Sequence, residues 1–576
     1  MKRKTFILLS GFLILSFSTI LGQPVKSTDI YYQTSDVQPL MQHYESDKGS
    51  LTRFYSILNS PERRIRFIAF NKDYLTQLEE LNFDKMKTDS KVDYILLKRQ
   101  INDELFLLEK EADEVQHINQ YFPFANAIYE LEKNRRRGAH VNSIELSRQL
   151  LDWQKQIQSL TTKVAIADKF DQKLALRAES TAIGLKQAMK SVFEFYYGYD
   201  PEFTFWIQQP YKNLDSSLSA YALLLKSKGN KESLQKPDAS GIIGNPIGRE
   251  ELIRQLQFEM INYTPEELVD IANKEFAWCD AEMLKASKEM GFGNDWKAAL
   301  EKVKNSYVPV GQQPEMIMDL YNQSIDFIKK HDLVTIPPLA EETWRMVMMS
   351  PKQQLVSPFF LGGEQLMISY PTNTMDEDAK LMSMRGNNPH FSRATVHHEL
   401  IAGHHLQGFM NDRYKPYRNY FTPFWTEGWS LYWEFILWDM NFPRSPEDRV
   451  GMLFWRMHRC ARIIFSLNYH LNNWTPQECI DFLVNRVGHE RANAEGEVRR
   501  SFTGGYGPLY QLAYMTGAFQ FYELKKELVD SKKMTYKQFH DAILKENNMP
   551  VEMVRAILLK QDLKKDFKTN WRFYNR

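Results

Sequence analysis

The residues best suited to chemistry lie in segment 395–407, Thr-Val-His-His-Glu-Leu-Ile-Ala-Gly-His-His-Leu-Gln. Positions 397–405 hold four histidines and one glutamate, although the whole chain has only 13 histidines. Imidazole nitrogens and carboxylate oxygens bind zinc at about 2.0–2.2 Å, and zinc hydrolases often supply them from a His-Glu pair followed by another histidine. The segment therefore indicates a zinc site.

The spacing departs from the usual His-Glu-x-x-His motif, in which residues four apart share one face of a helix. Ala402 stands four residues after His398. On a regular helix, His404 would lie about 240° around from His398, and His405 would lie about 10.5 Å along the axis. We therefore predict a helix distorted by two bulged residues, aided by Gly403, with His404 as the second ligand. His405 is the alternative.

A second segment, 425–432, Trp-Thr-Glu-Gly-Trp-Ser-Leu-Tyr, offers the third ligand. Glu427 lies 23 residues after His404. A proline-containing loop over 415–423 separates the segments, and Glu427 opens a predicted apolar helix over about 427–440. A carboxylate in such a run is costly unless it is paired or binds a metal. The predicted ligands are therefore His398, His404 and Glu427.

Other residues receive roles from the chemistry that such a site performs. Glu399 would take a proton from a metal-bound water and pass it to the leaving amine. A developing oxyanion needs a hydrogen-bond donor, for which the candidates are Tyr514, His470 and Tyr506. Glu434 is placed to accept the second N–H of a histidine ligand.

The two segments resemble the core of a bacterial family of unknown function that is grouped with the gluzincin metallopeptidases. The shared pattern is His-Glu-x-x-x-Gly-His-His-x-Gln followed by Glu-Gly-Trp-x-x-Tyr. The second segment also resembles the zinc-ligand helix of membrane alanyl aminopeptidases, and the lengthened first spacer resembles that of dipeptidyl peptidase III. The family usually has proline where this chain has Ala402. The resemblance runs from about Ile247 to Gly517 and implies a zinc metallopeptidase with one zinc per chain.

Hydrophobic spacing predicts a mainly α fold, and the resemblance implies a large, helical, gluzincin-like architecture. Two helix starts are explicit, because Thr264 and Thr475 each precede a proline and then a glutamate at the third helical position. A small β element is expected near the active-site helix, with strands at 355–360 and 365–370 around a Gly-Gly turn.

The organisation of the chain is predicted from its start and from a glycine-rich break. Residues 1–22 combine basic residues with an apolar run, which is typical of a signal peptide. Residues 23–240 form a predicted N-terminal helical region, and residues 241–576 a zinc-dependent catalytic region. No cysteine stands at the end of the apolar run, so a lipid-attached form is not expected. No other long apolar run exists, so we expect an exported, periplasmic or extracellular protein without stable membrane insertion after cleavage.

Composition limits the partners. The chain has 73 basic and 72 acidic residues, a balance that argues against nucleic acid. Three cysteines permit at most one internal disulfide.

The predicted function is hydrolysis of short peptides, and the alternatives are a metal-dependent hydrolase of another ester or amide and a peptide-binding protein without turnover. The N-terminal helices are expected to wall a deep cleft, with Arg499 or Arg500 holding a peptide's C-terminus.

Overall fold

The computed structural model describes residues 34–574, apart from 231–237, 355, 356, 358 and 504. Nearly all regular structure in these residues is helical, and the strands form two small two-stranded sheets. The predicted mainly α class with a small β element is therefore confirmed. No helix in the described part of the chain combines the length and apolar character needed to span a bilayer. The predicted signal peptide, residues 1–22, lies outside the described residues.

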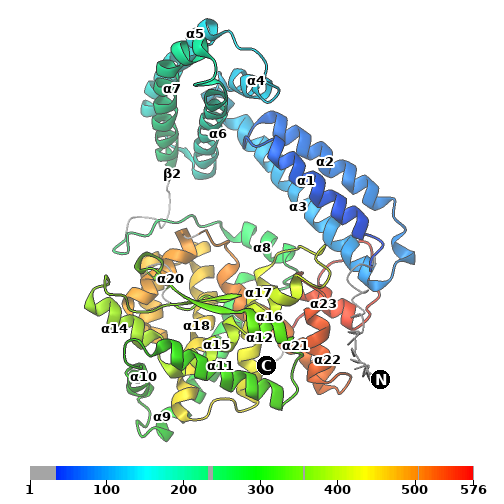
Figure 1. Ribbon diagram of the computed structural model, residues 1–576, viewed down its shortest axis with the longest axis vertical. Coiled ribbons are helices and arrows are strands. Elements are labelled where there is room, and N and C mark those ends of the chain that lie inside the picture. Colours follow the sequence, from blue (N-terminus) through cyan, green and yellow to red (C-terminus); the bar gives the residue numbers. More distant parts are fainter. Residues whose placement is uncertain (1–33, 231–237, 355–356, 358, 504, 575–576) are drawn as a thin grey trace, which may run out of the picture.

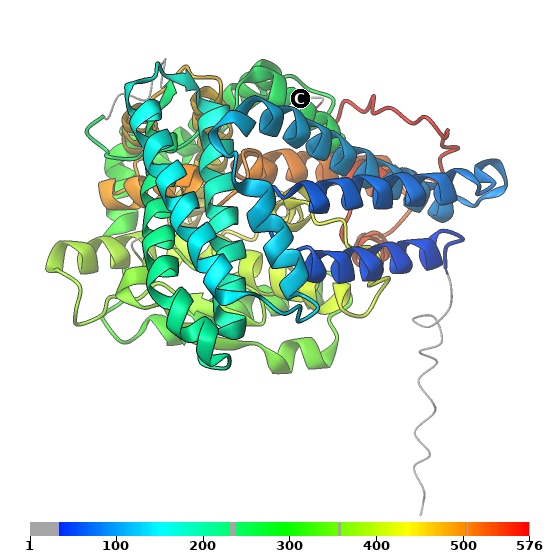
Figure 2. The same ribbon diagram turned by 90° about the horizontal axis from the view of Figure 1, so that it is seen from above.

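The first seven helices form two groups above the larger body in Figure 1. Helices α1 to α3 run side by side, and α4 to α7 form the second group (Figures 1 and 2). Their bounds are α1 Gln38–Phe54, α2 Pro61–Glu79, α3 Thr88–Ile118, α4 Ala125–Arg135, α5 Ser143–Ile166, α6 Gln172–Tyr196 and α7 Pro201–Ser227, with 3-10 turns η2 Phe83–Lys85 and η3 Asn119–Tyr121. Strand β1 (Phe170–Asp171) pairs in parallel with β2 (Gly229–Asn230).

The larger body contains the remaining elements. They are α8 Arg249–Phe258, α9 Pro265–Glu289, α10 Trp296–Lys304, α11 Gln313–Lys330, α12 Pro338–Thr343, α13 Pro351–Gln354, α14 Glu377–Gly386, α15 Pro389–Glu399, α16 His404–Asn411, α17 Pro423–Asp439, α18 Pro446–His470, α19 Pro476–Phe482, α20 Arg491–Thr503, α21 Tyr510–Lys525, α22 Tyr536–Leu544 and α23 Val551–Leu558, with π-helical turns η4 Leu483–Val487 and η5 Lys526–Asp530. Both predicted capping boxes, at Thr264 and Thr475, are present.

Two clusters of buried apolar side chains hold these elements together. One lies among α4 to α7 and extends to Ile57. The other joins α1, α2 and the first part of α3 to the larger body, from Val37 to Phe573. Fully buried Arg418 strengthens this attachment, since its Nε donates to Asp93 Oδ1 of α3 at 2.7 Å. Helices α1 to α3 thus share their core with the second half of the chain, and the division at residue 240 stays a prediction.

The small β element differs from its prediction in one strand. Strand β4 (Gln365–Ile368) lies within the predicted second strand, but its partner is β3 (Arg345–Met348), which runs parallel to it. Residues 355, 356 and 358 of the predicted first strand lie outside the described residues, and Leu361 makes a single antiparallel bridge to Met367. This bridge lies around the predicted Gly-Gly turn, and the preceding segment β3 is a second, parallel neighbour of β4 that was not predicted.

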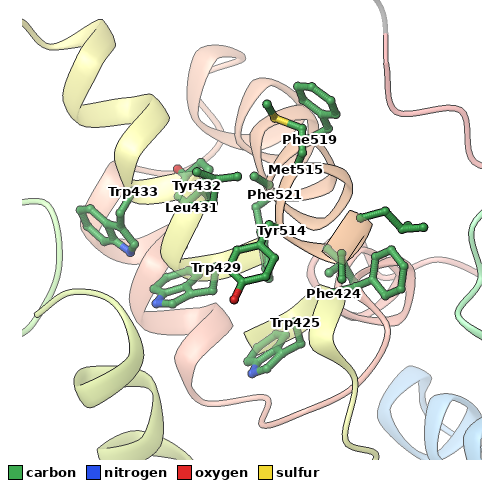
Figure 3. Close-up of a cluster of buried hydrophobic side chains, with 14 of the residues drawn as sticks. Phe424, Trp425, Trp429, Leu431, Tyr432, Trp433, Tyr514, Met515, Phe519 and Phe521 are labelled. Carbon is green, nitrogen blue, oxygen red and sulfur yellow. The ribbon is translucent and has the colours of Figure 1, made fainter. Parts of the chain in front are cut away.

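Helices α17 and α21 pack closely at the centre of the body. Figure 3 shows aromatic side chains of α17 beside Tyr514, Phe519 and Phe521 of α21. Two glycines allow the approach, because a Cβ at Gly428 would lie 2.6 Å from the Cα of Gly517. Helix α17 begins at Pro423, four residues before the predicted start, because Thr422 caps it through the Phe424 N–H.

This packing predicts a large effect for one added methyl group. Gly428→Ala forces α17 and α21 apart and should destabilise the protein by about 1–3 kcal/mol. Gly408→Ala in α16 is the matched control, because its Cβ would meet no atom within 4 Å. It should leave stability unchanged or raise it by about 0.5–1 kcal/mol. Thermal unfolding midpoints measure both, and equal midpoints for the two variants would contradict the close-packing account.

Candidate metal centre

The helix that carries the first histidines is interrupted. Helix α15 ends at Glu399 and α16 begins at His404, with residues 400–403 between them. The N–H of Gly403 donates to the carbonyl of His397 at 3.0 Å, which closes the loop. The prediction of one helix with two bulged residues is therefore wrong, because the chain breaks the helix and starts a new one.

Gly403 is required where the break closes. A Cβ at this position would overlap the backbone carbonyl of His398. The residue has φ −84° and ψ −132°, outside the helical region. The helix break therefore forms although residue 402 is alanine and not the proline that is usual in the family.

The break brings the three predicted ligands together. The Nε2 of His404 lies 3.1 Å from Glu427 Oε2, and the Nε2 of His398 lies 3.7 Å from the same oxygen. The two imidazole rings are 4.9 Å apart and nearly perpendicular. Glu399 also places a carboxylate oxygen near the pair, with its ligand atom and those of both histidines all within 4.8 Å of one another. The donors come from α15, α16 and α17.

An unpartnered carboxylate oxygen suits this site for a cation. Glu427 Oε2 is buried and has no hydrogen-bond partner among the described residues, although two imidazole nitrogens face it. A buried polar atom without a partner is costly. Two imidazoles and a carboxylate are a donor set that binds zinc. The residues present therefore fit a zinc ion.

Neighbouring groups hold these donors in place. The other oxygen of Glu427 accepts a hydrogen bond from the Tyr510 hydroxyl. Burial raises the pKa of Glu427, but His404 and His398 outweigh burial and hold that pKa well below its usual range. His398 Nδ1 lies 2.8 Å from Glu434 Oε1, the contact expected from the sequence. Burial lowers the pKa of His398, but Glu427 and Glu434 raise it overall to about 9.

The candidate base lies beside this set. Burial is the main cause that raises the pKa of Glu399 above its usual range. The backbone of the loop before β4 covers it, because a Cβ at Gly362 would overlap Glu399 and the Gly363 N–H donates to its carbonyl at 3.1 Å. The loop therefore packs so closely against Glu399 that residue 362 must be glycine.

The two other histidines of the first segment point elsewhere. His405 Nε2 lies 2.7 Å from the carbonyl oxygen of Ala340 in α12. His397 is buried against Phe442, and burial lowers its pKa to about 4. The alternative assignment of His405 as second ligand is therefore wrong, because its imidazole faces α12.

Two of the three oxyanion candidates lie at the site. Tyr514 stacks parallel to His398 at 6.2 Å, and Tyr506 lines the same cavity. His470 does not reach it. It ends α18, packs against Tyr469 and Phe502, and burial lowers its pKa to about 4. The assignment of His470 is corrected, because its helix carries it away from the ligands.

Sequence reasoning missed several residues at the site. Tyr510 was recognisable from its spacing, because it precedes Tyr514 by four residues and shares its helix face. The guanidinium groups of Arg459 and Arg462 lie 4.6 and 4.3 Å from the Tyr514 ring. Arg462 Nε donates to buried Glu497 at 2.6 Å. These positions in α18 and α20 carried no signal in the sequence beyond their charge.

A cavity of about 340 Å³ adjoins the donors. The described residues that line it run from Leu361 to Tyr514 and include Glu399, His404, Glu427, Arg500, Tyr506 and Tyr510. The predicted wall from the N-terminal helices is wrong for this cavity, since its lining comes from the larger body. A larger cavity of about 660 Å³ lies between α3, β1 and the segment before α8, and none of the ligands lines it.

Comparisons with known proteins place the chain by fold and family. The model of a family described as Bacterial protein of unknown function (DUF885) matches residues 56–558. A search among curated proteins finds no match. A proposed lipoprotein of unknown function from Shewanella oneidensis is 15% identical with a TM-score of 0.64, covering 90% of this chain and 99% of that chain. A proposed lipoprotein from Colwellia psychrerythraea is 16% identical with a TM-score of 0.54, covering 90% and 98%.

The buried ion pair behind Tyr514 predicts an acid-dependent loss of stability. Burial raises the pKa of Glu497, but Arg462 and Arg500 lower it overall from 4.5 to about 2. A depressed folded-state pKa stabilises the protein above pH 4.5 by about 3 kcal/mol, and this contribution is lost as pH falls toward 2. Glu497→Gln should therefore cost about 3 kcal/mol at pH 7, and less as pH falls below 5.

The control is Glu495→Gln on the same helix, because Glu495 is only partly buried. Unfolding free energies measured between pH 2 and 7 test the account. A cost of Glu497→Gln that is small, or that stays constant with pH, would contradict it.

Proposed function

We propose that this chain, which belongs to the DUF885 family of bacterial proteins of unknown function, is an exported zinc-dependent metallopeptidase. The observation that carries the proposal is the convergence of His398 Nε2 and His404 Nε2 on the unpartnered Glu427 Oε2. Glu399 and a cavity of about 340 Å³ lie beside these three donors. This arrangement is consistent with a gluzincin-like site of two histidines and a glutamate, with one zinc per chain.

His398, His404 and Glu427 would hold the zinc. Three protein ligands leave one position open for water, which distinguishes catalytic from structural zinc sites. When bound, zinc acts as a Lewis acid and lowers the pKa of a coordinated water from 15.7 to about 7. Glu434 fixes the orientation of His398 through Nδ1, so that Nε2 is the nitrogen free to bind metal.

Glu399 would act as the general base. Its carboxylate lies next to the ligand atoms, and burial raises its pKa toward the range in which a carboxylate can both accept and return a proton. It would take a proton from the attacking water and deliver it to the leaving amine. Tyr514 is the oxyanion donor that we propose, because it stacks on His398 and lines the cavity.

Short peptides are the proposed substrates. The volume of about 340 Å³ lies near the lower end of the range for small-molecule sites, so it suits a short unfolded segment and excludes a folded protein. The apolar start of the sequence supports export, and both structural relatives are described as proposed lipoproteins.

The ligand assignment predicts the metal content of two neighbouring variants. The purified protein should hold about one zinc per chain, and His404→Ala should lose it, because a catalytic zinc site needs three protein ligands. His405→Ala is the matched control and should keep its zinc, since His405 faces Ala340. Elemental analysis measures both. Zinc that survives His404→Ala, or that is lost in His405→Ala, would disprove the assignment.

The base assignment predicts a separation of metal binding from turnover. Glu399→Gln keeps the three ligands, so it should retain zinc while its rate of peptide hydrolysis falls by about 10²–10⁴-fold. A digest of a short-peptide library, followed by mass spectrometry, measures the rate for the wild type and the variant. Near-normal hydrolysis by Glu399→Gln would remove this residue from the mechanism, and a wild type that retains zinc but cleaves no peptide would refute the peptidase proposal.

A further inference from the structure

Three arginines gather around Tyr514. Three buried guanidinium groups, those of Arg459, Arg462 and Arg500, surround two carboxylates that are outside the ligand set. Arg459 lies 3.6 Å from Glu434, which also bonds His398. Arg462 and Arg500 share Glu497, at 2.6 and 3.4 Å. Outside the ligand set, Arg500 therefore has no carboxylate of its own among the described residues.

Arg500 is the member of this group that faces the cavity. It lines the cavity with Glu399 and Tyr506, while only 5% of its surface is exposed. Its buried Nε faces Glu497 Oε2 at 3.4 Å and makes no hydrogen bond within the described residues. Its guanidinium group lies 5.1 Å from the ring of Tyr506, which packs at a tilt against Tyr510 with ring centroids 4.2 Å apart. A buried guanidinium group that lines a cavity and shares its carboxylate with another arginine can accept a further anionic partner.

Contacts connect this cation to the metal centre. Tyr506 lies between Arg500 and Tyr510, and the hydroxyl of Tyr510 donates to Glu427. A group held by Arg500 would therefore lie in the same cavity as the proposed ligands. Arg499, by contrast, is exposed and does not line the cavity. Arg499 and Arg500 were the two residues that the sequence offered for binding a peptide's C-terminus. Only Arg500 lines the cavity.

We propose that Arg500 binds the C-terminal carboxylate of the substrate, so that the enzyme removes residues from the C-terminal end of short peptides. This inference rests on the proposed peptidase function. A guanidinium group matches a carboxylate with two parallel hydrogen bonds, and Arg500 shares its one carboxylate neighbour, Glu497, with Arg462. Arg500 is a specificity-determining residue in this account.

The test compares peptides that differ only at the C-terminus. A short peptide that the zinc-loaded full chain cleaves is prepared as the free acid, as the C-terminal amide, and as an amide whose last residue is glutamate. The wild type should prefer the acid by about 10- to 100-fold in kcat/KM, as expected for hydrogen bonds to a charged group. Arg500→Gln should abolish this preference by slowing only the acid.

Matched variants separate recognition from folding. Arg499→Gln should keep the full preference, because Arg499 is exposed. Arg500→Lys keeps the positive charge but cannot make two parallel hydrogen bonds to a carboxylate, so it should keep part of the preference. This variant serves as the test if Arg500→Gln proves unstable. Binding of the acid and the amide to zinc-loaded Glu399→Gln, measured by calorimetry, gives the same ratio without turnover.

Each outcome decides the inference. Equal cleavage or binding of acid and amide overturns it, and so does a preference that survives Arg500→Gln. If the glutamate-terminated amide equals the acid, Arg500 recognises a side-chain carboxylate and the C-terminal assignment is wrong. If no peptide is cleaved but the acid still binds preferentially through Arg500, the peptidase proposal fails while carboxylate recognition stands.

Discussion

Two imidazole groups six residues apart must reach one carboxylate oxygen, and a regular α-helix would place them about 240° apart. The chain satisfies this constraint by ending α15 at Glu399 and starting α16 at His404. The carbonyl of His398 then lies where a Cβ of residue 403 would be, so glycine is required there. The same break leaves Glu399 facing the cavity beside the ligands that it would serve.

The carboxylate that the histidines approach is fixed by a second close contact. Gly428 and Gly517 let α17 and α21 approach closely, which places Tyr510 and Tyr514 next to Glu427. Helices hold such groups more precisely than loops do. The buried Arg459, Arg462 and Arg500 gather around Tyr514, and Arg500 also lines the cavity. We infer from this arrangement how a peptide is oriented in the cavity.

Much of the site could be predicted from the sequence, because short motifs report residues that are close in both sequence and space. The ligands, Glu399 and Glu434 were predictable in this way. The helix break was not, because alanine at 402 gives no sign of it and the constraint is a contact between backbones. Other features depend on packing between segments that are far apart in the sequence, so no local pattern reports them. These are the contact of Tyr510 with Glu427, the contact of Arg462 with Glu497, and the pairing of β4 with β3. His470 was misplaced for the same reason.

The central claim is that His398, His404 and Glu427 hold one zinc, and X-ray absorption at the zinc edge of the purified protein tests it most directly. The account predicts nitrogen and oxygen donors at about 2.0–2.2 Å, with outer-shell scattering from two imidazole rings. His404→Ala should remove the signal of one ring or the metal itself. A sulfur donor at about 2.3 Å, or a shell without imidazole scattering, would contradict the account.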